Sequence, residues 1–110
     1  MMNLGRLWQL AKEWLFPRRK LQRIEGDVLP SRLPWRNLFL LTEDGEDWCV
    51  AFRCPCGCGQ RIELPLIEEA VPRWSLKLDK QGYPSLHPSV WLREGCRSHF
   101  FLRDGKIIWV

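Results

Sequence analysis

The sequence predicts a small, mainly β protein, an α+β fold in which one N-terminal amphipathic helix precedes an antiparallel β domain. Three observations predict this class. Short apolar runs of strand length recur from about residue 37 to the last residue. Turn residues separate these runs, and Asp104–Gly105 between two apolar runs is typical of a β-hairpin. Helical periodicity is confined to the first residues of the chain.

The bulk composition describes one folded domain. A chain of 110 residues with 45% apolar and 27% charged residues has the composition of a globular protein and length for a modest core. We find no signal-peptide pattern and no apolar run long enough to span a bilayer. A cytoplasmic location is therefore expected.

The predicted helix covers Asn3–Phe16, where apolar residues recur every three to four positions. Pro17 ends it, and a basic run, Arg18–Lys20, follows. Such a stripe most often packs against its own domain, and a membrane surface or a partner protein are the alternatives. A connector over Leu21–Trp35 completes an N-terminal part, residues 1–36, which precedes the β domain, residues 37–110.

Alternating or continuous apolar patterns bounded by turn residues predict the strands of the β domain. The first two should form an antiparallel hairpin. Tyr83–Trp91 contains two prolines, so we expect at most an edge or irregular strand there. The other predicted strands are Asn37–Thr42, Trp48–Arg53, Gln60–Leu66, Trp74–Leu78, Arg97–Arg103 and Lys106–Val110.

The positive charge lies in the N-terminal part. Residues 1–36 hold eight Lys and Arg against three Asp and Glu, whereas residues 37–110 hold nine against ten. Nucleic-acid readers usually have a clustered basic face. The charge distribution therefore argues against nucleic-acid binding by the β domain, and the short basic stretch is the weakest of the candidate binding sites.

Two clusters of metal-ligating residues stand about forty positions apart. The first is Arg-Cys-Pro-Cys-Gly-Cys-Gly at Arg53–Gly59, and the second is Cys-Arg-Ser-His at Cys96–His99. Cysteine thiolates and imidazole suit Zn²⁺, and closely spaced cysteines in a cytoplasmic protein are more often ligands than disulfides. We therefore expect one Zn²⁺ site between the clusters. Its candidate ligands are Cys54, Cys56, Cys58, Cys96 and His99.

Five candidates for four tetrahedral positions leave the role of the zinc open. Four protein ligands would make a structural site, and three with a bound water would make a catalytic one. The fifth cysteine, Cys49, lies within a predicted strand and is expected to be a small packing residue. His87 is a reserve ligand, and Ser89 and Ser98 could orient a ligand or substrate, although loop hydroxyls more often cap backbone.

The motifs together resemble a bacterial family long labelled a domain of unknown function. They are Cys-Pro-Cys-Gly-Cys-Gly, a later Pro-Ser-Val and Cys-Arg-Ser-His-Phe, and the resemblance covers about residues 53–109. It implies a zinc-dependent peptidase that trims or removes a bacterial ubiquitin-like modifier, encoded beside proteins like E1 and E2. The ligand candidates match the family's metal motif, and Ser89 and Ser98 match further polar positions. No catalytic base can be assigned.

Two functions follow as expectations. The first is the zinc-dependent, deubiquitinase-like peptidase that the resemblance implies, with a ubiquitin-like protein or its conjugates as partner. The alternative is a non-catalytic, zinc-stapled adaptor that binds a component of the conjugation pathway, such as the modifier or an E1-like or E2-like protein.

Overall fold

The computed structural model describes residues 7–8, 11, 13 and 15–110. The expected helix over Asn3–Phe16 falls largely on residues outside this set, and the described residues 7, 8, 11, 13 and 15 within it have helical conformation. From Leu21 on, the chain forms eight strands in two sheets of four. The mainly β prediction is therefore confirmed.

The first sheet has the order β1-β2-β3-β4. β1 (Leu21–Glu25) runs parallel to β2 (Leu38–Glu43), which pairs antiparallel with β3 (Glu46–Arg53). β4 (Arg61–Pro65) completes the sheet beside β3. The predicted hairpin of the first two β-domain strands is confirmed. β1 lies inside the segment expected to be a connector, so that prediction was incomplete.

The second sheet has the order β5-β6-β7-β8. Its strands are β5 (Ser75–Leu78), β6 (Pro84–Trp91), β7 (His99–Arg103) and β8 (Lys106–Trp109), all paired antiparallel. The Asp104–Gly105 hairpin is confirmed, and both residues have positive φ, 48° and 78°, as a type I′ turn requires. A side chain on Gly105 would also collide with the carbonyl oxygen of Arg19, 2.6 Å from its Cβ position.

β6 lies between β5 and β7, so of the two expected alternatives, an edge strand or an irregular strand, the structure shows the irregular one. Its pairing with β7 is irregular, as the prolines suggested. Leu86 opposes Leu102 and Val90 opposes Phe100, so four steps along β6 match two along β7. Pro84 stands at the start of the strand and Pro88 stands inside this bulge. Neither position needs a ladder N–H, which explains how a central strand tolerates two prolines.

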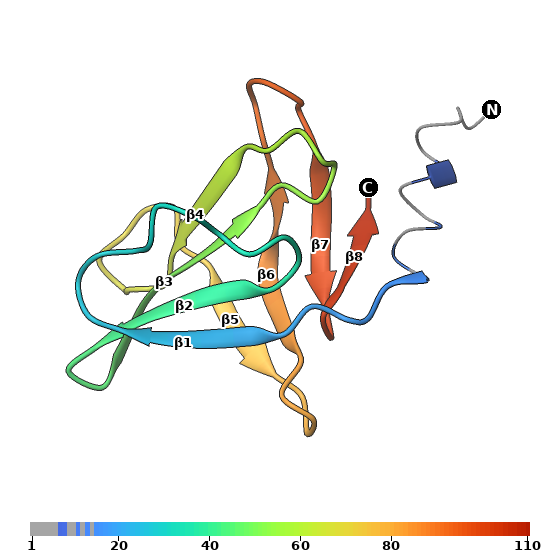
Figure 1. The fold of residues 1–110 in the computed structure, drawn as a ribbon. Coiled ribbons are helices and arrows are strands. Elements are labelled where there is room, and N and C mark those ends of the chain that lie inside the picture. Colours follow the sequence, from blue (N-terminus) through green and yellow to red (C-terminus); the bar gives the residue numbers. More distant parts are fainter. Residues whose placement is uncertain (1–6, 9–10, 12, 14) are drawn as a thin grey trace.

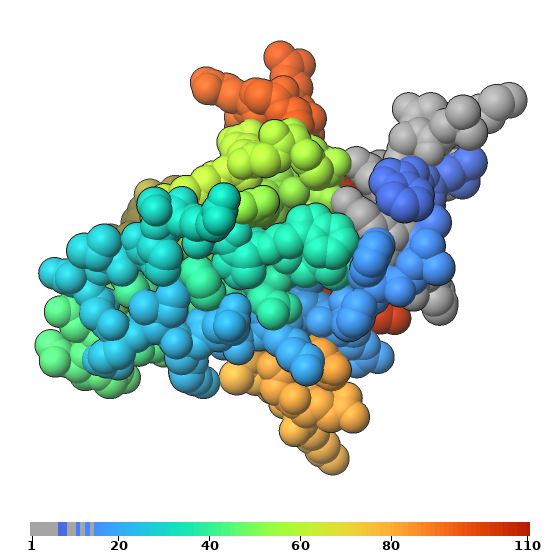
Figure 2. Space-filling model, in the orientation of Figure 1, coloured from blue at the N-terminus to red at the C-terminus, as the bar shows by residue number. Residues whose placement is uncertain are grey.

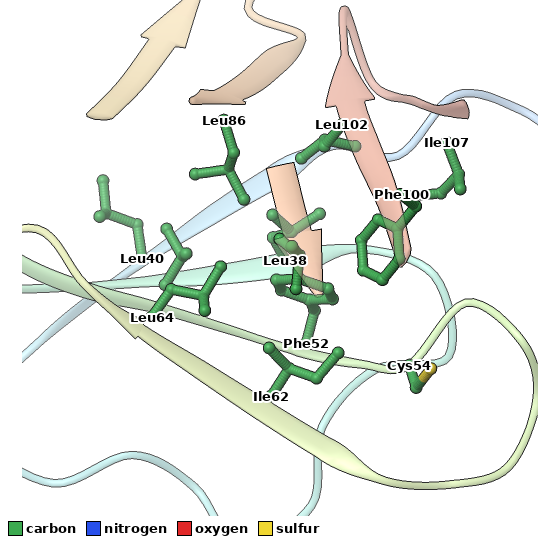
Figure 3. Packing of buried hydrophobic residues seen from close by; sticks show 12 residues of the cluster. Leu38, Leu40, Phe52, Cys54, Ile62, Leu64, Leu86, Phe100, Leu102 and Ile107 are labelled. Carbon is green, nitrogen blue, oxygen red and sulfur yellow. The ribbon is translucent and has the colours of Figure 1, made fainter. Parts of the chain in front are cut away.

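The two sheets pack face to face, and their strands cross steeply (Figure 1). Alternate residues of each strand point inward, so the apolar positions of both sheets meet in one core. Figure 3 shows this layer, with Cys54 at its margin where β3 leaves the sheet. The fully or nearly fully buried apolar residues include Leu38, Leu40, Val50, Phe52, Ile62, Leu64, Leu86, Val90, Phe100, Leu102 and Ile107.

Hydrogen bonds join the segment before β1 to the second sheet. The backbone N–H of Arg19 donates to the carbonyl oxygen of Gly105 at 2.8 Å. The carboxylate of Glu13 accepts from the N–H of Ile107 at 3.0 Å and pairs with the buried guanidinium of Arg19. Arg36 lies 3.7 Å from the same carboxylate. These contacts place the N-terminal segment against β8 (Figures 1 and 2).

Replacement of Phe100 by alanine should test the core. This ring is fully buried, and it contacts Phe52 of the other sheet and Trp109 of β8, at centroid distances of 6.2 and 5.7 Å. Because truncation leaves a cavity between the sheets, we expect Phe100→Ala to lower the free energy of unfolding by about 3–5 kcal/mol, measured by chemical denaturation. Ile108→Ala, at a position that is 43% exposed, is the control. An equal loss in both variants would contradict this packing.

Candidate metal centre and serine–histidine pair

Four cysteine sulfurs meet at one end of the molecule. The side chains of Cys54, Cys56, Cys58 and Cys96 have all their Sγ atoms within 4.8 Å of one another. The first three come from the β3–β4 loop and the fourth comes from the β6–β7 connection, so the cluster joins the two sheets. These two segments lie side by side at the top of Figures 1 and 2. The four cysteines could bind a metal ion.

Local backbone geometry lets three cysteines at alternate positions point to one centre. Gly57 and Gly59 have φ of 93° and 86°, in the region that side-chain-bearing residues rarely adopt. The N–H of Cys58 donates to the sulfur of Cys56 at 3.3 Å, and the N–H of Gln60 donates to Cys58 at 3.4 Å. Backbone N–H groups directed at sulfur stabilise thiolate ligands.

The spacing of the sulfurs fits a tetrahedral metal site. The sulfur of Cys54 lies 3.4 Å from that of Cys56 and 3.6 Å from that of Cys96. A tetrahedron with Zn–S bonds of about 2.3 Å has edges of about 3.8 Å. Four thiolates this close repel one another, so a cation between them is the natural way to keep all four ionised. The donor set therefore fits a metal ion.

Ser98 lies against the buried side of the cluster. Its hydroxyl is 3.2 Å from the sulfur of Cys96 and 3.6 Å from that of Cys54. Burial raises the pKa of the Cys54 thiol well above its usual range. Burial opposes ionisation of Cys96 also, but hydrogen bonds from the side chain and backbone of Ser98 and from neighbouring thiols lower its pKa to about 6. Ser98 thus favours the thiolate form of Cys96.

His99 lies outside this group of sulfurs and instead faces a serine. Its Nε2 is 3.0 Å from the hydroxyl oxygen of Ser89. His99 begins β7 and lies opposite Trp91 of β6, while Ser89 lies two residues before Trp91, beside the bulge. The two side chains share the outer face of the second sheet because the core-facing positions are taken by Val90 and Phe100. A hydroxyl at this distance from an imidazole is a candidate nucleophile with its base.

The backbone around the pair is held on both sides. The indole N–H of Trp74 donates to the carbonyl oxygen of Ser89 at 3.3 Å. The N–H of Val110 donates to the carbonyl oxygen of His99 at 3.0 Å. An open hollow of about 590 Å³ extends between the cysteine cluster and His99, and Gly57, Arg97 and Trp109 are among the residues that line it. Of the serine and histidine pair, His99 lines this hollow.

The remaining candidates are separate from both groups. Cys49 lies within β3, where burial and the nearby Glu63 carboxylate raise the pKa of its thiol. It opposes Leu41 and Pro65 in the sheet. His87 is exposed and lies opposite Ser75 of β5. Neither belongs to the sulfur cluster that the described residues form.

Comparison with protein families gives one match. The model for the bacterial ubiquitination-like system serine protease, BubE, matches residues 25–110. The chain belongs to this family. Comparison with curated proteins and with solved structures finds no match.

Membership in the BubE family confirms the resemblance found in the sequence and links the chain to a bacterial ubiquitination-like system. The family description specifies a serine protease, whereas the resemblance implied a zinc-dependent peptidase. Sequence reasoning placed Ser89 and His99 in matching motifs but did not recognise them as a pair. The signal was available, because a serine near the end of one strand and a histidine at the start of the next become neighbours when the strands pair antiparallel.

Metal content tests the cysteine cluster. We expect the purified protein to bind one Zn²⁺ per chain, and Cys96→Ser to lose most of it, because Cys96 alone brings the β6–β7 connection to the cluster. Cys49→Ser is the matched control and should keep its metal. Elemental analysis measures the stoichiometry, and Co²⁺ substitution should give the visible and thiolate charge-transfer absorption of a tetrahedral sulfur site. Equal metal content in both variants would contradict the assignment.

Proposed function

We propose that this protein is a serine protease that cleaves the C-terminal linkage of a bacterial ubiquitin-like modifier, with Ser89 as the nucleophile and His99 as the general base. The observation that carries the proposal is the 3.0 Å separation between the Ser89 hydroxyl and Nε2 of His99. The family description supports it independently. The substrate is either a precursor of the modifier or its conjugates.

The chemistry follows from that geometry. His99 accepts the hydroxyl proton as Ser89 Oγ forms a bond to the scissile carbonyl carbon. The tetrahedral intermediate collapses when the bond to the leaving amine breaks and His99 returns the proton to that amine. Water then attacks the ester carbonyl carbon while His99 accepts one of its protons. The bond from that carbon to Ser89 Oγ breaks, His99 returns the proton to Ser89 Oγ, and a free modifier C-terminus is released.

We propose that the metal is Zn²⁺ in a structural role. Cysteine thiolates favour Zn²⁺, and four of them complete a tetrahedral shell without leaving a position for water. Bound there, the ion would hold the β3–β4 loop and the β6–β7 connection together. The ligand candidates from the sequence also included His99. In this proposal His99 is not a metal ligand and instead acts as the general base for Ser89. Zinc dependence of the protease would then reflect the placement of His99, three residues after Cys96.

The division of the chain into an N-terminal segment and a β domain is also a proposal. We propose that residues 37–110 carry the site and that residues 1–36 form an N-terminal segment. The family match begins at residue 25, inside that segment, and β1 pairs with β2 of the β domain. No helix in the described part of the chain is long and apolar enough to cross a membrane. The cytoplasmic location and direct contacts with E1-like or E2-like proteins remain predictions.

Ser89→Ala should abolish cleavage of a fusion between the operon's ubiquitin-like protein and a reporter, lowering kcat by at least about a thousandfold because no other hydroxyl faces His99 among the described residues. His99→Ala should act similarly. Ser98→Ala is the matched control, since its hydroxyl faces the cysteines and its loss should change activity far less. Zinc content is measured for each variant.

The three competing functions give different results in this experiment. Full activity in a zinc-loaded Ser89→Ala protein, lost when the metal is removed, would support a zinc-dependent peptidase and contradict our proposal. Absence of cleavage by the unaltered protein, combined with binding of the modifier, would support the zinc-stapled adaptor. Loss of cleavage in Ser89→Ala with unchanged zinc content would support the serine protease.

A further inference from the structure

Trp91 lies directly against the imidazole of His99. The two residues are opposite each other in the β6–β7 register, and their rings are stacked, with centroids 4.8 Å apart and planes inclined by 9°. Cross-strand neighbours in an antiparallel pair approach closely enough for their side chains to restrain one another. The plane of the His99 ring is therefore set by Trp91 (β6 and β7 are adjacent in Figure 1).

The Trp91 ring also contacts a cation. The guanidinium carbon of Arg93 lies 3.8 Å from the centroid of the ring. Trp91 is 51% exposed, which by itself would suggest a docking residue for a partner. Trp91 therefore has two neighbours within its own chain, the stacked imidazole of His99 and the guanidinium of Arg93. These contacts restrain the indole although half of its surface is exposed.

His99 needs such an orienting group. In serine proteases with a catalytic triad, a carboxylate hydrogen-bonded to the second ring nitrogen fixes the orientation of the histidine. Among the described residues, the His99 ring forms its hydrogen bond with Ser89. No carboxylate of these residues forms an ion pair with it. The aromatic stack occupies the role that the carboxylate has elsewhere.

We infer that Trp91 is a positioning residue that holds the His99 imidazole in line with the Ser89 hydroxyl, and this inference rests on the function proposed above. Stacking restricts rotation of the imidazole about its side-chain bonds, so Nε2 stays within reach of Ser89 Oγ. This restraint acts on the chemical step rather than on substrate binding.

Three variants test whether Trp91 positions His99. Trp91→Ala removes the stack, and Trp91→Phe keeps an aromatic face. Trp48→Ala truncates a tryptophan of similar exposure, 38%, on β3 of the other sheet and serves as the control. For each, we would measure kcat and KM on the modifier fusion, and circular dichroism and zinc content would establish folding. The proton shifts of the His99 ring, measured by NMR, report the ring current of the stacked indole.

A small sulfonyl fluoride gives a readout that is independent of protein docking. Ser89 Oγ forms a bond to sulfur, the S–F bond breaks, His99 takes the hydroxyl proton and fluoride leaves. We expect Trp91→Ala to lower kcat and the rate of this labelling together, by roughly tenfold to a hundredfold, with little change in KM. Trp91→Phe should recover most of both rates, and Trp48→Ala should match the unaltered protein.

The outcomes also separate this inference from the proposed function. If Trp91→Ala keeps its kcat and labelling rate, or changes KM alone, Trp91 does not position His99 and the inference is overturned. If the unaltered protein is not labelled at Ser89, the proposed serine mechanism itself is overturned. An unchanged His99 ring shift in Trp91→Ala would show that the stack does not form in solution and would equally overturn the inference.

Discussion

The convergence of four cysteine sulfurs is the constraint on which the rest of the site depends. Three of them lie in the loop that follows β3, and Cys96 lies in the connection between β6 and β7. These segments belong to different sheets, which otherwise meet through apolar side chains. Apolar packing is weakly directional, whereas metal–thiolate bonds fix distances and angles. A metal ion bound by the four sulfurs would therefore fix the position where β7 begins, and His99 is the first residue of that strand.

The position of Ser89 depends on a different feature, the bulge in β6. With regular pairing, four steps along β6 would match four along β7, but here they match two. The extra residues, which include Pro88, change the direction of the strand just before Ser89. Ser89 then lies diagonally across from His99, with Trp91 opposite it. One partner of the pair is thus placed by the sulfur cluster and the other by an irregularity in the adjacent strand.

Sequence reasoning predicted most of the strands and two hairpins, but not the pairing of β6 with β7 that forms the site. β2, β3, β7 and β8 were predictable because apolar residues and Asp-Gly turns mark them clearly. β1 was missed because it is mostly exposed and follows a basic run, so its stability comes from pairing with β2. The four cysteines were predictable from residue chemistry. For Ser89 and His99 the sequence could indicate only that two strand ends are neighbours. The contact itself depends on strand register, and a register change of one residue would put Ser89 on the core face.

Separating the metal from the reacting atoms has a physical advantage. Zn²⁺ held by four thiolates has much of its charge neutralised and is a poor Lewis acid, but it is a rigid link. A histidine bound to such an ion could not accept a proton from serine. With His99 outside the sulfur cluster, its Nε2 is available to Ser89, while Cys96 still anchors the backbone three residues away. In the proposed mechanism the short Cys-Arg-Ser-His segment thus joins a structural site to a reactive one. The Ser98 hydroxyl faces the sulfurs of Cys54 and Cys96, and the His99 imidazole faces the Ser89 hydroxyl.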